Sequence, residues 1–236
     1  MRWRLIPYEE GSAPWNMALD EAILEAFISD DAPPTLRFYG WSEPVVTIGR
    51  LQPISSMPAG WGTPVVRRPT GGRAVRHGGD LTFSLILDAA VLSSRVRESY
   101  RLVGEAIARA LVSLGVPAEL CRNRTPPASV RRIGNCFDLT LDYEVAVEGA
   151  KVLGSAQVRR AGALLQQNSL LLSPSQRWPE RGKLTEAIIH ALEAEFDVDI
   201  HPGELTEVEL QIARRLADNK YACDGWNLRG VLLHSN

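Results

Sequence analysis

Residues 67–84 read RRPTGGRAVRHGGDLTFS in this chain of 236 residues. The stretch holds four arginines, one histidine and four glycines between two apolar runs, 63–66 and 81–87, that are typical of buried strands. Paired glycines allow a positive φ and a close approach of the backbone to a ligand, and guanidinium groups bind phosphate or carboxylate. We call this stretch the glycine-rich loop and predict that it receives an anionic group. The alternative is a solvated hairpin with incidental charge.

Composition narrows the class of protein. A hydrophobic content of 45% and a charged content of 23% are ordinary for a soluble globular chain. The net charge of −2 argues against general nucleic-acid binding, so anion recognition must be local. No apolar run is long enough to span a membrane, and the first residues lack the apolar core of a signal peptide. We expect a cytoplasmic protein that binds neither nucleic acid nor membrane.

Hydrophobic periodicity predicts alternating strands and helices. Strands are expected at 5–8, 35–39, 45–48, 63–66, 81–87, 116–120, 143–147, 151–157 and 163–172, and helices after an N-cap at Asn16 and over 94–114, 180–196 and 204–219. Glu148-Gly149 and the run 159–162 (RRAG) are predicted to be hairpin turns between the last strands, and residues 220–227 to end the chain in turns. The pattern favours an α+β fold with a mixed, largely antiparallel β-sheet flanked by helices.

Cys136 is the candidate nucleophile. It follows a basic segment, 122–134, and precedes a predicted strand, and nearby cations lower the pKa of a thiol that a loop keeps accessible. Strand pairing can bring Lys151 close to it. The alternative is that Cys136 is a small buried hydrophobic residue, the common role of a free cysteine. The three cysteines of the chain form no C-x-x-C pair, which argues against a disulfide framework or a metal site.

The run from Lys151 to Gln157 is the second notable stretch. Gly154, Ser155 and Ala156 are all small, which suggests that a ligand lies across this strand. A lysine that protects a sheet edge from aggregation is the alternative for Lys151. Pairing with the apolar run 163–172 suggests a channel suited to an acyl chain. His77 is a candidate base or anion ligand.

These motifs resemble the biotin/lipoate protein ligase and transferase superfamily. Residues 68–77 resemble its R-R-x-T-G-G-x-x-V-x-H signature, and residues 149–157 its G-x-K-x-x-G-S-A-Q signature, while 16–21 and 36–41 also match. The similarity within it is greatest to LipM-type octanoyltransferases, through Arg73 after the glycine pair, Cys136-Phe137-Asp138, and the ending KYACDGWN at 220–227. We expect one catalytic domain over 1–236, with its core at about 30–220 and no separate C-terminal accessory domain.

The resemblance implies octanoyl transfer from acyl carrier protein to the lysine of a lipoyl domain, such as glycine cleavage H protein, in lipoate biosynthesis. Cys136 would carry the acyl group as a thioester and Lys151 would lower the pKa of the thiol, with no metal, no ATP and no other cofactor. The expected substrate-binding residues are Arg67, Arg68, Thr70, Gly71, Gly72, Arg73, His77, Gly154, Ser155 and Ala156. We expect a monomer in which Arg122, Arg124, Arg131 and Arg132 dock acidic carrier proteins.

Three alternatives stay open. The chain can be an ATP-dependent lipoate–protein ligase, an amidotransferase between lipoyl domains, or a non-catalytic acyl-binding protein on the same fold. The sequence also departs from the superfamily pattern, because Gln167-Asn168 replaces a His-Gly pair and His77 is followed by Gly78-Gly79-Asp80. Either Asp80 supplies the acid that usually follows this histidine, or no acid is needed.

Overall fold

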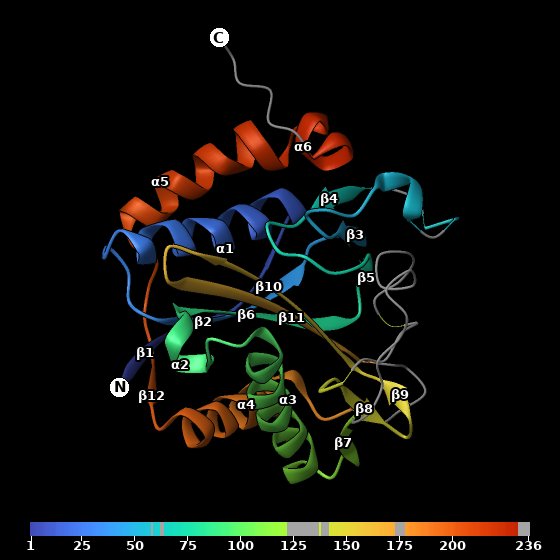
Figure 1. Ribbon diagram of the computed structural model, residues 1–236, viewed down its shortest axis with the longest axis vertical. Helices are drawn as coiled ribbons and strands as arrows, with labels where there is room; N and C mark the ends of the chain where they lie inside the picture. Colours follow the sequence, from blue (N-terminus) through green and yellow to red (C-terminus); the bar gives the residue numbers. More distant parts are fainter. Residues whose placement is uncertain (58, 62–63, 122–136, 138–141, 173–177, 231–236) are drawn as a thin grey trace.

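A mixed six-stranded β-sheet forms the centre of the molecule (Figure 1). The computed structural model describes residues 1–57, 59–61, 64–121, 137, 142–172 and 178–230. The strand order is β10-β11-β6-β2-β1-β12. These strands are β1 (Arg2–Gly11), β2 (Thr35–Trp41), β6 (Asp80–Asp88), β10 (Leu153–Arg160), β11 (Ala163–Leu171) and β12 (Asp199–Pro202).

Both pairing directions occur in this sheet. Neighbours from β10 through β11 and β6 to β2 are antiparallel, whereas β1 is parallel to both β2 and β12. The α+β fold with a largely antiparallel mixed sheet is therefore confirmed. The edge strand β12 was missed by the prediction, because only one of its four residues, Ile200, is buried and it gives no periodic signal.

Two three-stranded sheets flank the large one. The first has the order β4-β3-β5, built from β3 (Val45–Ile48), β4 (Val65–Arg67) and β5 (Val75–His77). The second has the order β7-β8-β9, built from β7 (Ala118–Leu120), β8 (Val145–Val147) and β9 (Ala150–Lys151). The predicted strand 151–157 is thus split at Val152, because Lys151 pairs with β8 and Leu153 with β11.

Helices cover both faces of the large sheet, as Figure 1 shows. On one face lie α1 (Ala13–Ile28) and α5 (Glu207–Leu216), and on the other α3 (Val96–Ser113) and α4 (Arg181–Phe196), with the short α2 (Ala89–Leu92) beside β6. The largest hydrophobic core fills the layer between the sheet and α3 and α4. No helix in the described ranges is both long and apolar enough to cross a membrane.

The start of the first helix differs from the prediction. Ser12 is the N-cap residue of α1, and Asn16 lies inside the helix with its side chain fully buried. Pro14 explains the earlier start, because proline suits the first turn of a helix. The Asn16 amide instead donates to the carbonyls of Gly11 and Gly40, so it links the helix to the strands that flank it.

The chain end is also ordered in a way that the prediction missed. A π-helical turn (Ala217–Tyr221) continues α5, and α6 (Asp224–Arg229) follows it. Lys220, Tyr221, Trp226 and Asn227 are all buried. The sequence shows turn residues here, but long-range contacts with α1 and β4 hold the segment in a helical form.

Two predicted hairpins are confirmed. The turns Glu148-Gly149 and Ala161-Gly162 join β8 to β9 and β10 to β11, and φ is positive at all four residues. Two positive φ values in a two-residue loop are typical of a type I′ turn, whose twist matches that of the strands. The tight turn at Ala161-Gly162 therefore sets the register between β10 and β11.

A buried ion pair joins the two ends of the sequence. Arg4 of β1 contacts both carboxylate oxygens of Glu209 in α5 at 2.8 and 2.5 Å, and the two side chains are 8% and 0% exposed. Thr35 accepts two further hydrogen bonds from the Arg4 guanidinium. Glu209 also completes a capping box with Thr206 at the start of α5. The pair therefore fixes this helix to the sheet.

Replacing Glu209 by glutamine is expected to destabilise the fold by about 3 kcal/mol or more, because it leaves the buried Arg4 charge uncompensated. Urea unfolding at neutral pH measures the change. Glu207→Gln is the matched control in the same turn of α5, and its exposed side chain predicts a change within about 0.5 kcal/mol. Equal effects of the two substitutions would contradict this account of the ion pair.

Candidate active site

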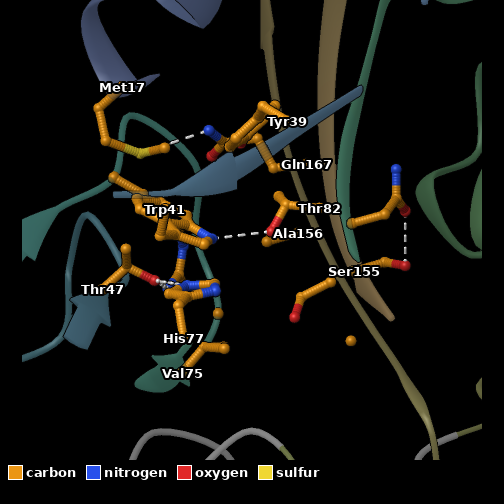
Figure 2. A pocket seen from close by; sticks show the side chains of 15 residues that line it. Met17, Tyr39, Trp41, Thr47, Val75, His77, Thr82, Ser155, Ala156 and Gln167 are labelled. Atoms are coloured by element: carbon orange, nitrogen blue, oxygen red, sulfur yellow. Dashed lines mark hydrogen bonds between the residues drawn. The ribbon is translucent and has the colours of Figure 1, made fainter. Parts of the chain in front are cut away.

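A pocket lies between the large sheet and the β4-β3-β5 sheet (Figure 2). Its space, counted with the part open to solvent, is about 380 Å³. It is lined by Met17, Tyr39, Trp41, Thr47, Arg68, Gly72, Val75, His77, Thr82, Gly154, Ser155, Ala156, Gln167, Asn168 and Ser169. Aromatic rings, aliphatic groups and small residues make most of these walls.

The structure brings six of the predicted site residues to this pocket. They are Arg68, Gly72, His77, Gly154, Ser155 and Ala156. The glycine-rich loop and the small residues of β10 therefore face the same space, although more than 75 residues separate them in the chain. Arg67, Thr70, Gly71, Arg73 and Lys151 lie elsewhere, and Cys136 and the four arginines predicted to dock carrier proteins fall outside the described residues.

The burial of its arginines shows that the glycine-rich loop is not a solvated hairpin. Arg67, Arg68 and Arg73 are only 3–7% exposed. The loop also contains β5, which pairs with β3 and which the prediction missed because its three residues are too few to show alternation. Gly49 permits this packing, since a Cβ atom there would lie 2.0 Å from the carbonyl oxygen of Gly72.

His77 is held on three sides. Its Nδ1 lies 2.7 Å from the Asp80 carboxylate, its Nε2 lies 2.8 Å from the Thr47 hydroxyl, and its ring stacks on Trp41 with centroids 4.1 Å apart. A carboxylate only accepts hydrogen bonds, so Nδ1 carries the proton. The Thr47 hydroxyl both donates and accepts, so it suits either protonation state at Nε2. Direct proton transfer between His77 and a substrate would require the Thr47 contact to break.

Asp80 is the carboxylate that pairs with His77, in place of the acid that usually follows this histidine directly. Burial opposes its ionisation, but the charge of His77 and hydrogen bonds from His77, Ser169 and Thr82 outweigh this and hold the pKa of Asp80 well below its ordinary value. Trp41 Nε1 donates to Thr82 Oγ1, which in turn donates to Asp80. One carboxylate thus organises one end of the pocket.

Arg68 continues this array on the other side of His77. Its Nη1 donates to Thr47 Oγ1 at 2.7 Å, and its Nη2 donates to the carbonyls of Gly71 and Arg73 at 2.9 and 2.8 Å. The guanidinium therefore shapes the glycine-rich loop from inside. Asp80, His77, Thr47 and Arg68 form one hydrogen-bonded chain that spans the pocket wall.

Polar groups also support the inner end of the pocket. Gln167 accepts from the Thr70 hydroxyl at 2.7 Å and donates to the carboxylate of Asp20 at 2.8 Å and to the sulfur of Met17 at 3.4 Å. Asp20 is fully buried and also accepts from Arg37 and Tyr39. Thr70 therefore acts on the pocket through Gln167.

Arg67 binds the backbone of its own chain. Its Nη1 donates to the carbonyls of Gly49, Arg50 and Gln52 at 2.7–3.1 Å, and its Nε donates to that of Trp226 at 2.9 Å. Burial lowers the pKa of this guanidinium. These contacts tie the start of the loop to α6 and to the turn after β3.

Lys151 is buried rather than exposed at a sheet edge. Its side chain is 1% exposed and forms an ion pair of 2.5 Å with Glu144. Although β9 is an edge strand of its small sheet, the Lys151 ammonium is turned away from solvent. The ammonium also lies 5.6 Å from the ring centroid of Phe137, the residue that follows Cys136 in the sequence.

Comparison with known proteins identifies the family. Residues 12–188 match the lipoyl protein ligase A/B catalytic domain. The chain belongs to this family. Curated relatives called octanoyltransferase LipM, from Symbiobacterium thermophilum and Bacillus subtilis, are 37% and 33% identical to it, and each alignment covers 96% of this chain and 98% of the relative.

Solved structures of lipoate ligases share the fold. Lipoate-protein ligase A bound with ATP superposes with a TM-score of 0.81 at 25% identity, over 98% of this chain and all of that one. A bi-partite lipoate protein ligase from Thermoplasma acidophilum gives 0.74 at 24% identity, over 100% and 99% of the two chains. The biotin/lipoate ligase catalytic fold predicted from the motifs is confirmed.

Several residues of this ligase-family pocket were missed by sequence reasoning as site residues. Met17, Trp41 and Gln167 were noted only as parts of matching or departing motifs, and Thr47 carried no signal. Their role depends on which strands face one another, which no local pattern states. Within the described ranges, no group of three His, Cys, Asp or Glu residues could hold a metal ion.

The pairing of Asp80 predicts a pH dependence of stability. Its folded-state pKa lies below the ordinary value of 3.8, so the ionised carboxylate stabilises the fold above that pH, and this contribution is lost as the pH falls from about 5 toward the folded-state pKa. Urea midpoints between pH 7 and pH 2.5 should therefore fall more steeply for wild type than for Asp80→Asn. The exposed Asp31→Asn is the control, and parallel curves for wild type and Asp80→Asn would contradict the assignment.

Proposed function

We propose that this protein is an octanoyltransferase that moves an octanoyl group from acyl carrier protein to the lysine of a lipoyl domain, such as glycine cleavage H protein, in lipoate biosynthesis. The observation that carries the proposal is the near end-to-end match to curated octanoyltransferases. The identities of 33–37% exceed the 25% shared with the ATP-bound ligase. The pocket of this chain supports the same assignment.

The pocket suits an acyl chain in shape and chemistry. Met17, Tyr39 and Trp41 supply apolar surface on one side, and Val75 and Ala156 supply it on others, as Figure 2 shows. The polar groups beneath them are engaged with one another, so an apolar ligand does not strip water from unpaired donors. Burial of methylene groups contributes about 0.8 kcal/mol each, which favours a chain of several carbons.

Chemistry requires a nucleophile and a means to keep it ionised. In the proposed mechanism the Cys136 thiolate attacks the carbonyl carbon of the octanoyl thioester, and the carrier's phosphopantetheine thiolate leaves and takes up a proton. The acceptor lysine, as a neutral amine, then attacks the enzyme thioester, forms the amide and releases the Cys136 thiol. The Lys151 ammonium lies near the ring of Phe137, and Cys136 is the residue directly before Phe137 in the sequence. This supports Lys151 as the cation that lowers the pKa of the Cys136 thiol.

Energetics explain why no nucleotide is required in this scheme. Exchange of one thioester for another is nearly isoenergetic, and the final conversion of a thioester into an amide is downhill. An ATP-dependent ligase must instead activate a free carboxylic acid. Similarity to the ATP-bound ligase makes ligation the second candidate, and an amidotransferase that accepts octanoyl groups from another lipoyl domain is the third.

The deciding measurement is the intact mass of the protein after mixing with octanoyl acyl carrier protein in the absence of ATP. Wild type should gain one octanoyl group that hydroxylamine removes, and Cys136→Ala should gain none. Cys223→Ala is the matched control, since Cys223 lies in the chain end, and it should be acylated like wild type.

Lys151→Met should slow acylation about 100-fold or more at pH 7 and recover partly at higher pH.

Other outcomes separate the alternatives. Lipoyl-domain labelling that needs ATP and free octanoate or lipoate, and that survives Cys136→Ala, would make the protein a ligase. An adduct formed from octanoylated H protein but not from octanoyl acyl carrier protein would make it an amidotransferase. Bound fatty acid without any adduct would leave an acyl-binding protein.

A further inference from the structure

The chain end contacts helix α1 and the glycine-rich loop, two segments that border the pocket. Four buried residues, Lys220, Tyr221, Trp226 and Asn227, make these contacts, and we call them the C-terminal clamp. In Figure 1 the segment that carries them runs from α5 to α6, above α1 and next to β4. None of the four lines the pocket, so any effect on substrate must pass through other residues.

One arm of the clamp holds helix α1. Lys220 Nζ and the Tyr221 hydroxyl both donate to Glu21 Oε2, at 2.6 and 2.5 Å. Glu21 is 2% exposed, and the positive charges of Lys220 and Arg160 together with these bonds offset the cost of its burial. Met17 lies one helical turn before Glu21 and forms part of the pocket wall. This arm therefore sets where Met17 stands.

The other arm holds the glycine-rich loop. Asn227 Oδ1 accepts from the Arg67 N–H at 3.0 Å, and Trp226 Nε1 donates to the Arg67 carbonyl at 2.8 Å. Asn227 Nδ2 donates to the Tyr221 carbonyl at 2.8 Å, which joins the two arms. Arg68, the next residue after Arg67, lines the pocket. Both backbone polar groups of Arg67 are thus fixed by the chain end.

The space between the arms is filled by apolar contacts that continue into the pocket. Tyr221 and Trp226 meet edge to face with ring centroids 6.2 Å apart, and the Lys220 ammonium lies 4.1 Å from the Trp226 ring centroid. The same hydrophobic cluster contains Met17, Tyr39 and Trp41, all of them pocket residues. A shift of the clamp is therefore transmitted to the pocket wall by direct packing, since such interiors leave little free space.

From these contacts we infer that the C-terminal clamp fixes the distance between α1 and the glycine-rich loop and so sets the length and width of acyl chain that the pocket accepts. The inference rests on the proposed function for the identity of the chain as octanoyl. Lys220, Tyr221, Trp226 and Asn227 are positioning residues, because they act through Glu21 and Arg67. A looser clamp should admit longer chains and hold an octanoyl chain less tightly.

The test variant is Trp226→Phe, which keeps a ring in the cluster but removes the donor to Arg67. Its matched control is Trp3→Phe, a fully buried tryptophan in the largest hydrophobic core, whose Nε1 has no hydrogen-bond partner among the described residues. Both substitutions cost packing, and only the first touches the clamp. Thermal melts of the two variants record the general loss of stability.

Transfer kinetics with hexanoyl, octanoyl and decanoyl acyl carrier proteins supply the specific measurement. Trp226→Phe should raise the KM for the octanoyl donor about tenfold, the order expected for one buried hydrogen bond, and leave kcat within about threefold. The ratio of kcat/KM for octanoyl to that for decanoyl should fall about fivefold or more. Trp3→Phe should keep the wild-type ratio even where its melting temperature falls as far.

Calorimetric titration with free octanoic and decanoic acids separates this inference from the proposed function. If wild type transfers no octanoyl group, the proposed function fails, and the ratio of the two binding constants in wild type and Trp226→Phe still tests the clamp. A ratio unchanged by Trp226→Phe, or no binding of either acid to wild type, would overturn the inference. Tyr221→Phe removes a single hydroxyl and replaces Trp226→Phe if that variant does not fold, with the same expected direction.

Discussion

The buried carboxylate of Asp20 is the interaction on which the rest of the structure depends. It accepts hydrogen bonds from Arg37, Tyr39, Ser84 and Gln167 at 2.7–2.9 Å, so helix α1 is tied at one point to β2, β6 and β11. An unpaired charge at this depth would cost several kcal/mol, and only the complete set of donors compensates it. Because these strands and α1 surround the inner end of the pocket, the network also fixes where the pocket can lie.

Around this point the site is assembled from parts with separate tasks. Apolar side chains provide the surface for a ligand, while charged groups behind them hold those side chains in place. Asp80 orients His77, and the Arg67 guanidinium donates to main-chain carbonyls. Arg67 and Arg68 look in the sequence like ligands for an anion, yet both donate to main-chain carbonyls, because buried carbonyl groups of loops also need donors.

Local signals predicted much of the fold. The helical periodicity of α3 and α4, the paired turn residues Ala161-Gly162 and the apolar run of β6 all depend on neighbours in sequence, and the structure agrees with each. Elements that local signals missed are held by distant contacts. The chain end reads as turns, yet Glu21 and Arg67, about 200 and 160 residues away, make it helical and buried.

The sequence by itself holds the two motifs that meet at the pocket, and their resemblance to known signatures was enough to predict the family. It also determined the alternation of strands and helices, since periodicity records which side chains must leave water. Only the tertiary structure decided which of the motif residues face the pocket and which support it. Side-chain direction depends on strand register and on partners far away in the chain, and neither is written in any local stretch.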